Sequence, residues 1–136
     1  MTAKSLKAKL LAMVLAVSVI TGLLSTVRVS ARSEEPGAVD GIAVTARSTI
    51  GAGMASGTTS TNYYNPYVTC YVSGAYVAKN NTTGEYYSTT GSNTAISSAV
   101  ISFLAPSGYQ SVSIVCSHSA TKGNQTWTAT TDAYYN

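Results

Sequence analysis

The sequence predicts an all-β protein, built as a small antiparallel β-sandwich. Two observations lead to this fold class. Val, Ile, Thr and Tyr, which favour strands, are prominent after residue 31, and no sustained run of Leu, Lys and Glu occurs there. Several short segments alternate apolar and polar residues and end at clusters of Gly, Asn, Ser and Pro, as strands joined by turns do.

Residues 1–31 have the pattern of a signal peptide. Three lysines precede an apolar stretch at 10–24, and the segment ends on small residues at Ala31. A signal peptidase recognises a basic region, a short apolar core and a small residue before the cleavage point. We therefore expect a secreted, extracellular protein that begins near Arg32. The alternative is an uncleaved membrane anchor, although the apolar run is shorter than the ~20 residues of a spanning helix.

Removal of that segment removes most of the positive charge. The whole chain carries a formal net charge of +3, but residues 32–136 hold four basic residues against five acidic ones. A nearly neutral chain offers no basic patch of the kind that nucleic-acid binding requires. We therefore expect no nucleic-acid partner.

The first elements of the expected secreted chain are an arm and a strand. Residues 32–41 contain two glutamates followed by Pro-Gly and are expected to form a flexible N-terminal arm. The single sandwich domain would then occupy 42–136, with its first strand at 42–50. The small, polar stretch at 51–61 predicts either a weak strand or a mobile loop, and a turn follows it.

Two segments show the clearest strand pattern, and each contains a cysteine. Residues 67–79 place Cys70 on the apolar side and are expected to bend near Gly74, whereas 109–119 place Cys116 on the apolar side. In an oxidising compartment, this arrangement predicts one inter-strand disulfide. Closing a loop of 46 residues would contribute roughly 4 kcal/mol of stability.

The remaining elements include two hairpins and one ambiguous segment. Asn and Gly at 80–84 and 121–124 predict turns, followed by strands at 85–90 and 125–134. The apolar residues at 94–104 follow an amphipathic helical stripe, whereas the serines and β-branched residues there favour a strand. A short helix and a strand therefore both remain open for this segment.

The two cysteine-bearing regions resemble part of a known fold. Residues 68–74 look like the strand that carries the first cysteine of immunoglobulin-like domains, and 99–116 are similar to the other half. The resemblance implies an immunoglobulin-like sandwich in broad architecture. Trp127, the only tryptophan, follows the second cysteine, whereas that family has its tryptophan between the two cysteines. The resemblance therefore implies no functional residue.

Few residues suggest catalysis. His118 is the only histidine, and its serine neighbours would point to the opposite face of a strand. We expect it to be a partly buried structural residue, not a catalytic base. No phosphate-binding loop, zinc spacing or calcium loop occurs in the sequence. We therefore expect no enzyme, no metal and no cofactor, and a small hydrolase is the least favoured interpretation.

Tyrosine is the main functional signal. All ten tyrosines follow residue 31, and Tyr67 and Tyr71 alternate on the strand face opposite Cys70. Exposed aromatic rings supply contact area at low entropic cost, so these two residues and Trp127 are candidate ligand-binding residues. The structural alternative is cross-strand tyrosine pairing that only stabilises a sheet.

The sequence therefore favours a secreted, non-enzymatic binding or surface-interaction module that contacts an extracellular glycan or protein. The alternative function is that of a secreted antibacterial (bacteriocin-like) or membrane-active protein. In that alternative, the nearly uncharged stretch at 48–61 would insert into a bilayer.

Overall fold

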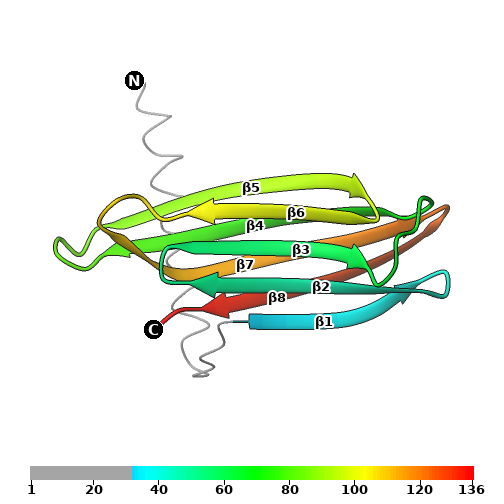
Figure 1. Cartoon of the computed structure of the whole chain (residues 1–136), viewed down its shortest axis with the longest axis horizontal. Coiled ribbons are helices and arrows are strands. Elements are labelled where there is room, and N and C mark those ends of the chain that lie inside the picture. The colour runs from blue at the N-terminus through cyan, green and yellow to red at the C-terminus, as the bar shows by residue number, and fades with distance from the viewer. Residues whose placement is uncertain (1–31) are drawn as a thin grey trace, which may run out of the picture.

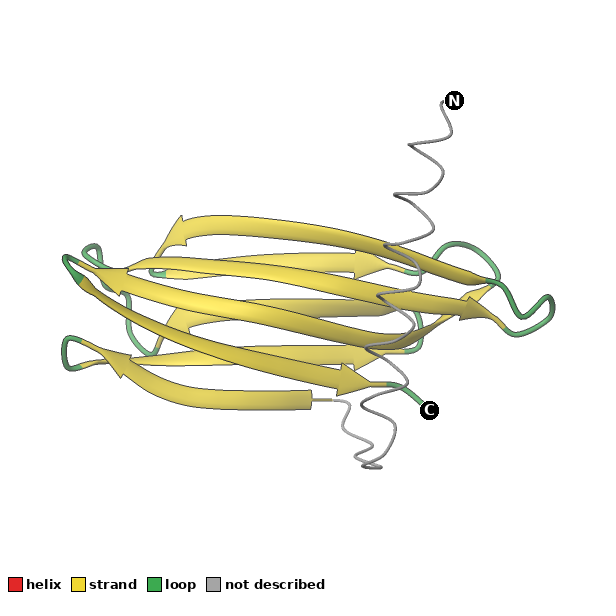
Figure 2. Cartoon of the chain, turned by 180° about the vertical axis from the view of Figure 1, so that it is seen from behind, coloured by secondary structure: helices red, strands yellow, loops and turns green. Residues whose placement is uncertain are grey.

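The computed structural model describes residues 32–136, in which eight strands and no helix occur (Figures 1 and 2). The expected signal peptide lies outside the described residues. The strands are β1 (Arg32–Val39), β2 (Ile42–Gly51), β3 (Met54–Thr61), β4 (Thr69–Asn80), β5 (Tyr86–Ile96), β6 (Ser98–Leu104), β7 (Tyr109–Lys122) and β8 (Gln125–Tyr134). The all-β prediction and both predicted hairpin turns are confirmed.

The strands form two antiparallel sheets of four strands each. One sheet has the order β1-β2-β3-β6 and the other has the order β5-β4-β7-β8. Figure 1 shows the first sheet in front of the second, with β5 and β6 at one side of the molecule and β1 and β8 at the other. The chain crosses between the sheets before β4, before β6 and before β7.

The core lies between the inner faces of the two sheets. It contains Val, Ile and Ala side chains from both sheets, together with both cysteines. Tyr76 of β4 is fully buried, stacks on Phe103 of β6 with ring centroids 5.4 Å apart, and hydrogen-bonds through its hydroxyl to Ser111. Each buried aliphatic or aromatic side chain contributes about 1.5–3 kcal/mol, so the shared core holds the two sheets together.

Two glycines allow the sheets to approach closely around Cys116. A Cβ atom on Gly57 of β3 would lie 2.5 Å from the Cys116 Sγ, and a Cβ atom on Gly74 of β4 would lie 3.1 Å from it. The first distance is too short for any side chain. Gly57 is therefore required because the sulfur of the opposite sheet occupies the space that its side chain would fill.

The prediction of a flexible arm at 32–41 is wrong for most of that segment. Residues 32–39 form strand β1, which pairs with β2 along its whole length. Arg32 and Arg47 both form ion pairs with Glu34, one of the two glutamates of this segment, on the sheet surface. The composition did not reveal that the free edge of β2 offers backbone partners to this segment.

The ambiguous segments at 51–61 and 94–104 both form strands. Residues 54–61 form β3, an inner strand of its sheet, so the mobile-loop alternative is wrong. Residues 94–104 contain the end of β5 and all of β6, and Ser97 between them has a φ of 66°. The apparent helical stripe arises because this left-handed residue joins two strands, which also excludes the short helix.

The expected bend in β4 is displaced. The register irregularity lies between Val77 and Ala78, not near Gly74, and leaves Val112 of β7 without a partner on β4. This bulge turns Ser111 and Ser113 inward, and both are buried. A strict alternation from Cys116 back along the strand would instead place Val112 inside and the two serines outside.

The predicted disulfide between Cys70 and Cys116 is not supported. Both cysteines are buried and face the core from neighbouring strands, as expected, but both are free thiols. Cys70 pairs with Ala120, and Cys116 pairs with Gly74, so the cysteines are four positions out of register. At about 3.4 Å per residue this offset is roughly 14 Å, whereas a disulfide needs Cα atoms within about 7 Å.

The same register removes the basis for the immunoglobulin-like comparison. In that family, the two cysteines lie on opposing sheets and bridge them. Here β4 and β7, which carry Cys70 and Cys116, are hydrogen-bonded neighbours in one sheet. The two-sheet architecture is therefore shared only in the general sense of facing antiparallel sheets.

Candidate functional site

The most exposed aromatic rings lie on the loop between β3 and β4. Tyr63, Tyr64 and Tyr67 are 88%, 79% and 75% exposed. We call residues 62–68 the tyrosine loop. It lies at the end of the molecule that also carries the β1–β2 and β7–β8 turns, on the right in Figure 1. Large exposed aromatics on an end loop are typical of recognition surfaces.

Hydrogen bonds to Ser97 hold the tyrosine loop. The Ser97 hydroxyl accepts the backbone N–H of Asn65 at 2.9 Å, and the Ser97 N–H donates to the Val68 carbonyl at 2.9 Å. Within the loop, the Asn65 side chain accepts the N–H of Tyr67 at 3.0 Å. The backbone that presents the rings is therefore anchored, which lowers the entropic cost of binding a ligand.

Tyr67 borders a shallow depression at the same end of the molecule. Its other lining residues come from the two neighbouring turns, and they are Asp40, Lys122, Gly123, Asn124 and Gln125. Lys122 donates to the Asp40 carboxylate, and the Gln125 side chain accepts the Asp40 N–H at 3.1 Å. The depression therefore combines an aromatic ring with amides and an internally neutralised charge pair.

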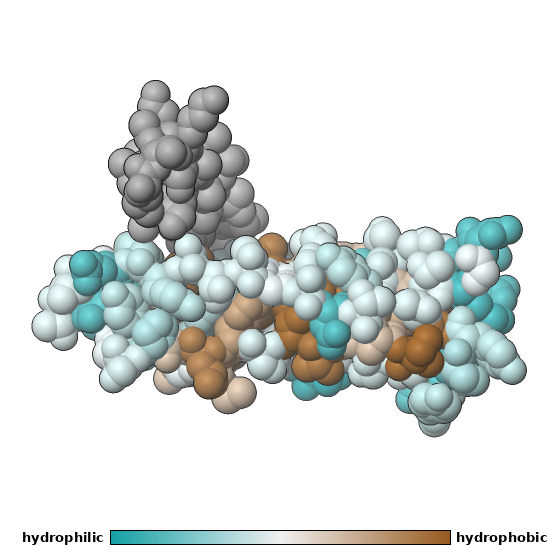
Figure 3. Space-filling model, turned by 90° about the horizontal axis from the view of Figure 1, so that it is seen from above, coloured by the Kyte–Doolittle hydropathy of each residue, from teal (hydrophilic) through white to brown (hydrophobic). Residues whose placement is uncertain are grey.

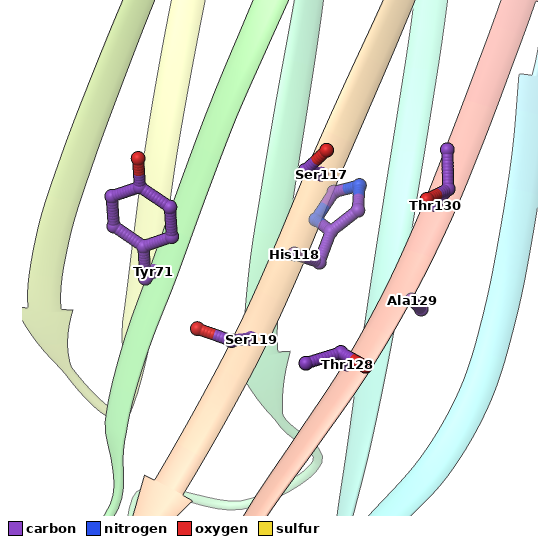
Figure 4. Close-up of a pocket in the computed structure, with 7 residues that line it drawn as sticks. All are labelled: Tyr71, Ser117, His118, Ser119, Thr128, Ala129 and Thr130. Carbon is purple, nitrogen blue, oxygen red and sulfur yellow. The ribbon is translucent and has the colours of Figure 1, made fainter.

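Tyr71 lies apart from the tyrosine loop, on the outer surface of the sheet β5-β4-β7-β8. It is 38% exposed and lines a second shallow depression with residues of β7 and β8 (Figure 4). In Figure 4, the side chains of Ser117 and Ser119 lie on β7, the strand next to Tyr71, and those of Thr128 and Thr130 lie on β8, on the far side of β7. The expected row of Tyr67 and Tyr71 on one strand is divided, because β4 begins at Thr69 and Tyr67 belongs to the loop.

Trp127 is not part of either surface. It lies opposite Ala120 in the register of β7 and β8, is partly buried, and packs against the core. Its indole ring occupies the space next to Gly37 of β1, where a Cβ atom would lie 2.0 Å from the indole Nε1. The three candidate residues Tyr67, Tyr71 and Trp127 are therefore not gathered into one site.

His118 lies in the interior, at the centre of a buried hydrogen-bond chain. It is 2% exposed, with its Nδ1 2.7 Å from the Thr59 hydroxyl and its Nε2 2.7 Å from the Thr131 hydroxyl. Thr131 also hydrogen-bonds to Ser48. Ser48 and Thr59 belong to one sheet, whereas His118 and Thr131 belong to the other. This hydrogen-bond chain therefore links the two sheets. The signal for it in the sequence was the repeated Ser and Thr residues of β2 and β3.

The backbone carbonyl of Tyr71 can only accept a hydrogen bond, and this fixes the donor and the acceptor in each hydrogen bond around His118. The Thr59 hydroxyl donates to the Tyr71 carbonyl at 2.7 Å, so its oxygen must accept the proton of His118 Nδ1. The Nε2 atom of the neutral ring then accepts from Thr131, which in turn accepts from Ser48. Every buried side-chain polar atom of the described residues has a partner.

Burial sets the protonation state of the interior groups. Desolvation lowers the pKa of His118 from 6.5 to about 4, so the ring is neutral near pH 7. Desolvation also raises the pKa values of the Cys70 and Cys116 thiols. The thiols are therefore protonated and shielded, which makes them poor nucleophiles.

Exposed apolar residues are scattered. Figure 3, which views the side where β5 and β6 lie, shows separate apolar patches within a mostly polar surface. The large exposed aliphatic residues of these two strands are Ile96, Val100 and Leu104. In residues 32–136, no helix has the length and apolar character needed to cross a membrane.

Comparisons with known proteins assign no family to the chain. No family model matches the sequence, and no curated protein matches it. Within residues 32–136, no three His, Cys, Asp or Glu side chains are grouped to hold a metal ion. Within residues 32–136, the exposed tyrosines and the outer surface around Tyr71 are therefore the candidate functional features.

Proposed function

We propose that this protein is a secreted, non-enzymatic binding module that uses the tyrosine loop to contact a glycan or protein at a cell or cell-wall surface. One observation carries the proposal. Three tyrosines, each at least 75% exposed, lie within five residues on a loop whose backbone is anchored to Ser97. Exposed rings of this size contribute little to the fold, whereas aromatic anchors dominate many recognition energies.

The neighbouring chemistry supports a neutral or weakly polar ligand. The depression beside Tyr67 offers the amides of Asn124 and Gln125, and its one ion pair is already satisfied between Asp40 and Lys122. Aromatic faces with adjacent amides suit sugar rings and peptide groups, because both present apolar faces and hydrogen-bonding edges. Export is part of this proposal and rests on the sequence pattern of residues 1–31.

The membrane-active alternative loses its proposed inserting segment. Residues 48–61 contain the end of β2 and all of β3, which are the two inner strands of their sheet. Alternate residues of this hairpin are buried, including Ser48 and Thr59 of the hydrogen-bond chain. Insertion of this segment would require the sheet to separate and the buried polar chain to break.

The tyrosine loop can be tested with a triple variant, Tyr63→Ser, Tyr64→Ser and Tyr67→Ser. We expect the parent protein, beginning at Arg32, to bind at least one member of a panel made of a glycan array, a bacterial cell-wall preparation and a host-cell preparation. The variant should lose at least about tenfold in affinity, since exposed aromatic anchors often contribute 2 kcal/mol or more each. Its melting temperature should change little, because the three rings are exposed.

The control is a double variant at the opposite end of the molecule, Tyr86→Ser and Tyr87→Ser. These rings are also exposed, at 48% and 37%, but lie at the start of β5, away from the tyrosine loop. The control should bind as the parent does. Equal binding by the triple variant, or no binding by the parent to any member of the panel, would refute the proposed function.

A further inference from the structure

The outer surface of the sheet β5-β4-β7-β8 carries a regular array of hydroxyl groups. Strand register aligns its outward residues in four rows across the sheet. Starting from the end with the tyrosine loop, the rows are Ile96, Thr69, Thr121 and Thr126; then Thr94, Tyr71, Ser119 and Thr128; then Ser92, Ser73, Ser117 and Thr130; then Thr90, Ala75, Val115 and Asp132. We call this surface the hydroxyl face, because eleven of its sixteen residues are Ser or Thr.

The hydroxyl face is nearly uncharged, and most of its hydroxyls are not used by the protein. Asp132, in the last row, is the only ionisable acid, and no Lys or Arg lies in the four rows. In the described chain, the hydroxyls around Tyr71 in Figure 4 make no hydrogen bond to another protein group, whereas Thr121 and Thr126 pair at 3.1 Å. The free hydroxyls can therefore donate to and accept from a ligand.

The sheet sets the spacing of these groups. Neighbouring strands lie about 4.8 Å apart, and outward residues along one strand lie about 7 Å apart. Tyr71 stands in the second row, where it supplies an apolar ring among the hydroxyls. The core packed against the inner surface of the sheet holds this arrangement fixed, so the hydroxyls form a pre-ordered array.

We propose that the hydroxyl face binds an extended, neutral polysaccharide chain. The inference rests on the proposed binding function and deepens it, because it adds a second contact surface and names the ligand class. Successive sugar rings present hydroxyls that can exchange hydrogen bonds with the rows, and their apolar faces suit the ring of Tyr71. No cation is present to attract an acidic polymer.

A protein partner fits this surface less well. The backbone groups of β4 and β7 are already used in the sheet, so an added peptide strand would find no backbone partners on the face itself. A typical protein interface also needs an apolar core, and the four rows offer only three apolar aliphatic side chains besides Tyr71.

The test is depletion from solution by microcrystalline cellulose and by chitin, with polygalacturonate as the acidic comparison. The face variant combines Tyr71→Ala, Thr128→Val and Thr130→Val. The matched control combines Met54→Ala, Thr58→Val and Ser60→Ala, which change the outward residues of β3 on the opposite sheet. Melting curves would confirm that both variants fold, and Ser117→Arg alone is a second face variant at an exposed position.

We expect cellulose or chitin to deplete the parent and the control equally, with no loss in high salt, because the contacts are uncharged. Both face variants should bind about tenfold more weakly, or worse. The inference is overturned if the parent binds neither neutral polymer, if it binds only polygalacturonate, or if both face variants bind as the parent does. A parent protein that binds a member of the panel through the tyrosine loop, but binds neither cellulose nor chitin, would reject this inference alone.

Discussion

At the scale of single residues, His118 sets how the interior responds to pH. Its neutral ring donates to Thr59 and accepts from Thr131, so a second proton on Nε2 would remove the acceptor that Thr131 requires. The low pKa of His118, about 4, results from burial away from water. The same residue therefore joins the two sheets and makes their association sensitive to acid.

We expect stability to fall as the pH falls from about 6.5 to about 4. In this range the unfolded chain binds a proton at His118 that the folded chain excludes, so protonation favours unfolding. The loss should be on the order of 2–3 kcal/mol. Because the chain has one histidine, an NMR titration of its ring reports this group directly. A ring that titrates near pH 6.5 in the folded protein would contradict the assignment.

At the scale of secondary-structure elements, the pairing of β4 with β7 decides the state of the cysteines. Alternation places both sulfurs toward the core, but the register leaves them four positions apart. Formation of a bridge would require one strand to slide along the other, which would break their hydrogen bonds and move the bulge at Val77. The stability of the domain therefore comes from packing and the buried hydrogen-bond chain, without a cross-link.

We expect both thiols to be free and protected in the folded protein. A thiol reagent under native conditions should label Cys70 and Cys116 slowly, because both are fully buried. The same reagent in denaturant without reductant should add two labels, as measured by intact mass. An absence of label in denaturant would show that a disulfide forms and that the register of β4 and β7 is wrong.

At the scale of the whole molecule, β1 closes the side of the sandwich that it shares with β8. Gly37 of β1 lies against the Trp127 indole, and Val39 at the end of β1 is buried in the core. Glu34 of β1 forms an ion pair with Arg47 on the neighbouring strand. The strand therefore covers Trp127 and completes the first sheet.

A chain that begins at Asp40 should expose Trp127 and lose stability. The removal of Val39 alone should cost about 1.5–3 kcal/mol, and a domain of this size loses about 4 to 8 °C in melting temperature per kcal/mol. Trp127 is the only tryptophan, so the shift of its emission to longer wavelength reports the change. A chain that begins at Arg32 is the control. An unchanged emission spectrum and melting temperature in the shorter chain would contradict the role assigned to β1.

The sequence by itself determined the all-β class, the main hairpin turns and the inward side of Cys70 on β4 and of Cys116 on β7. Alternation and turn residues are local properties, so they are visible in one strand at a time. The sequence also identified tyrosine as the signal for binding, but it placed Tyr67 and Tyr71 in one row and counted Trp127 with them. The structure places Tyr67 on the tyrosine loop, Tyr71 on the outer surface of a sheet and Trp127 at the edge of the core.

Only the tertiary structure decided the properties that depend on which strands become neighbours. The register separates Cys70 from Cys116, and the free edge of β2 turns residues 32–39 into a strand. Contact between the two sheets brings Ser48, Thr59 and Thr131 to His118, although they are far apart in the chain. The rows of the hydroxyl face likewise require four strands in register. A single strand shows which side faces inward, but its partner and its offset are set by non-local pairing.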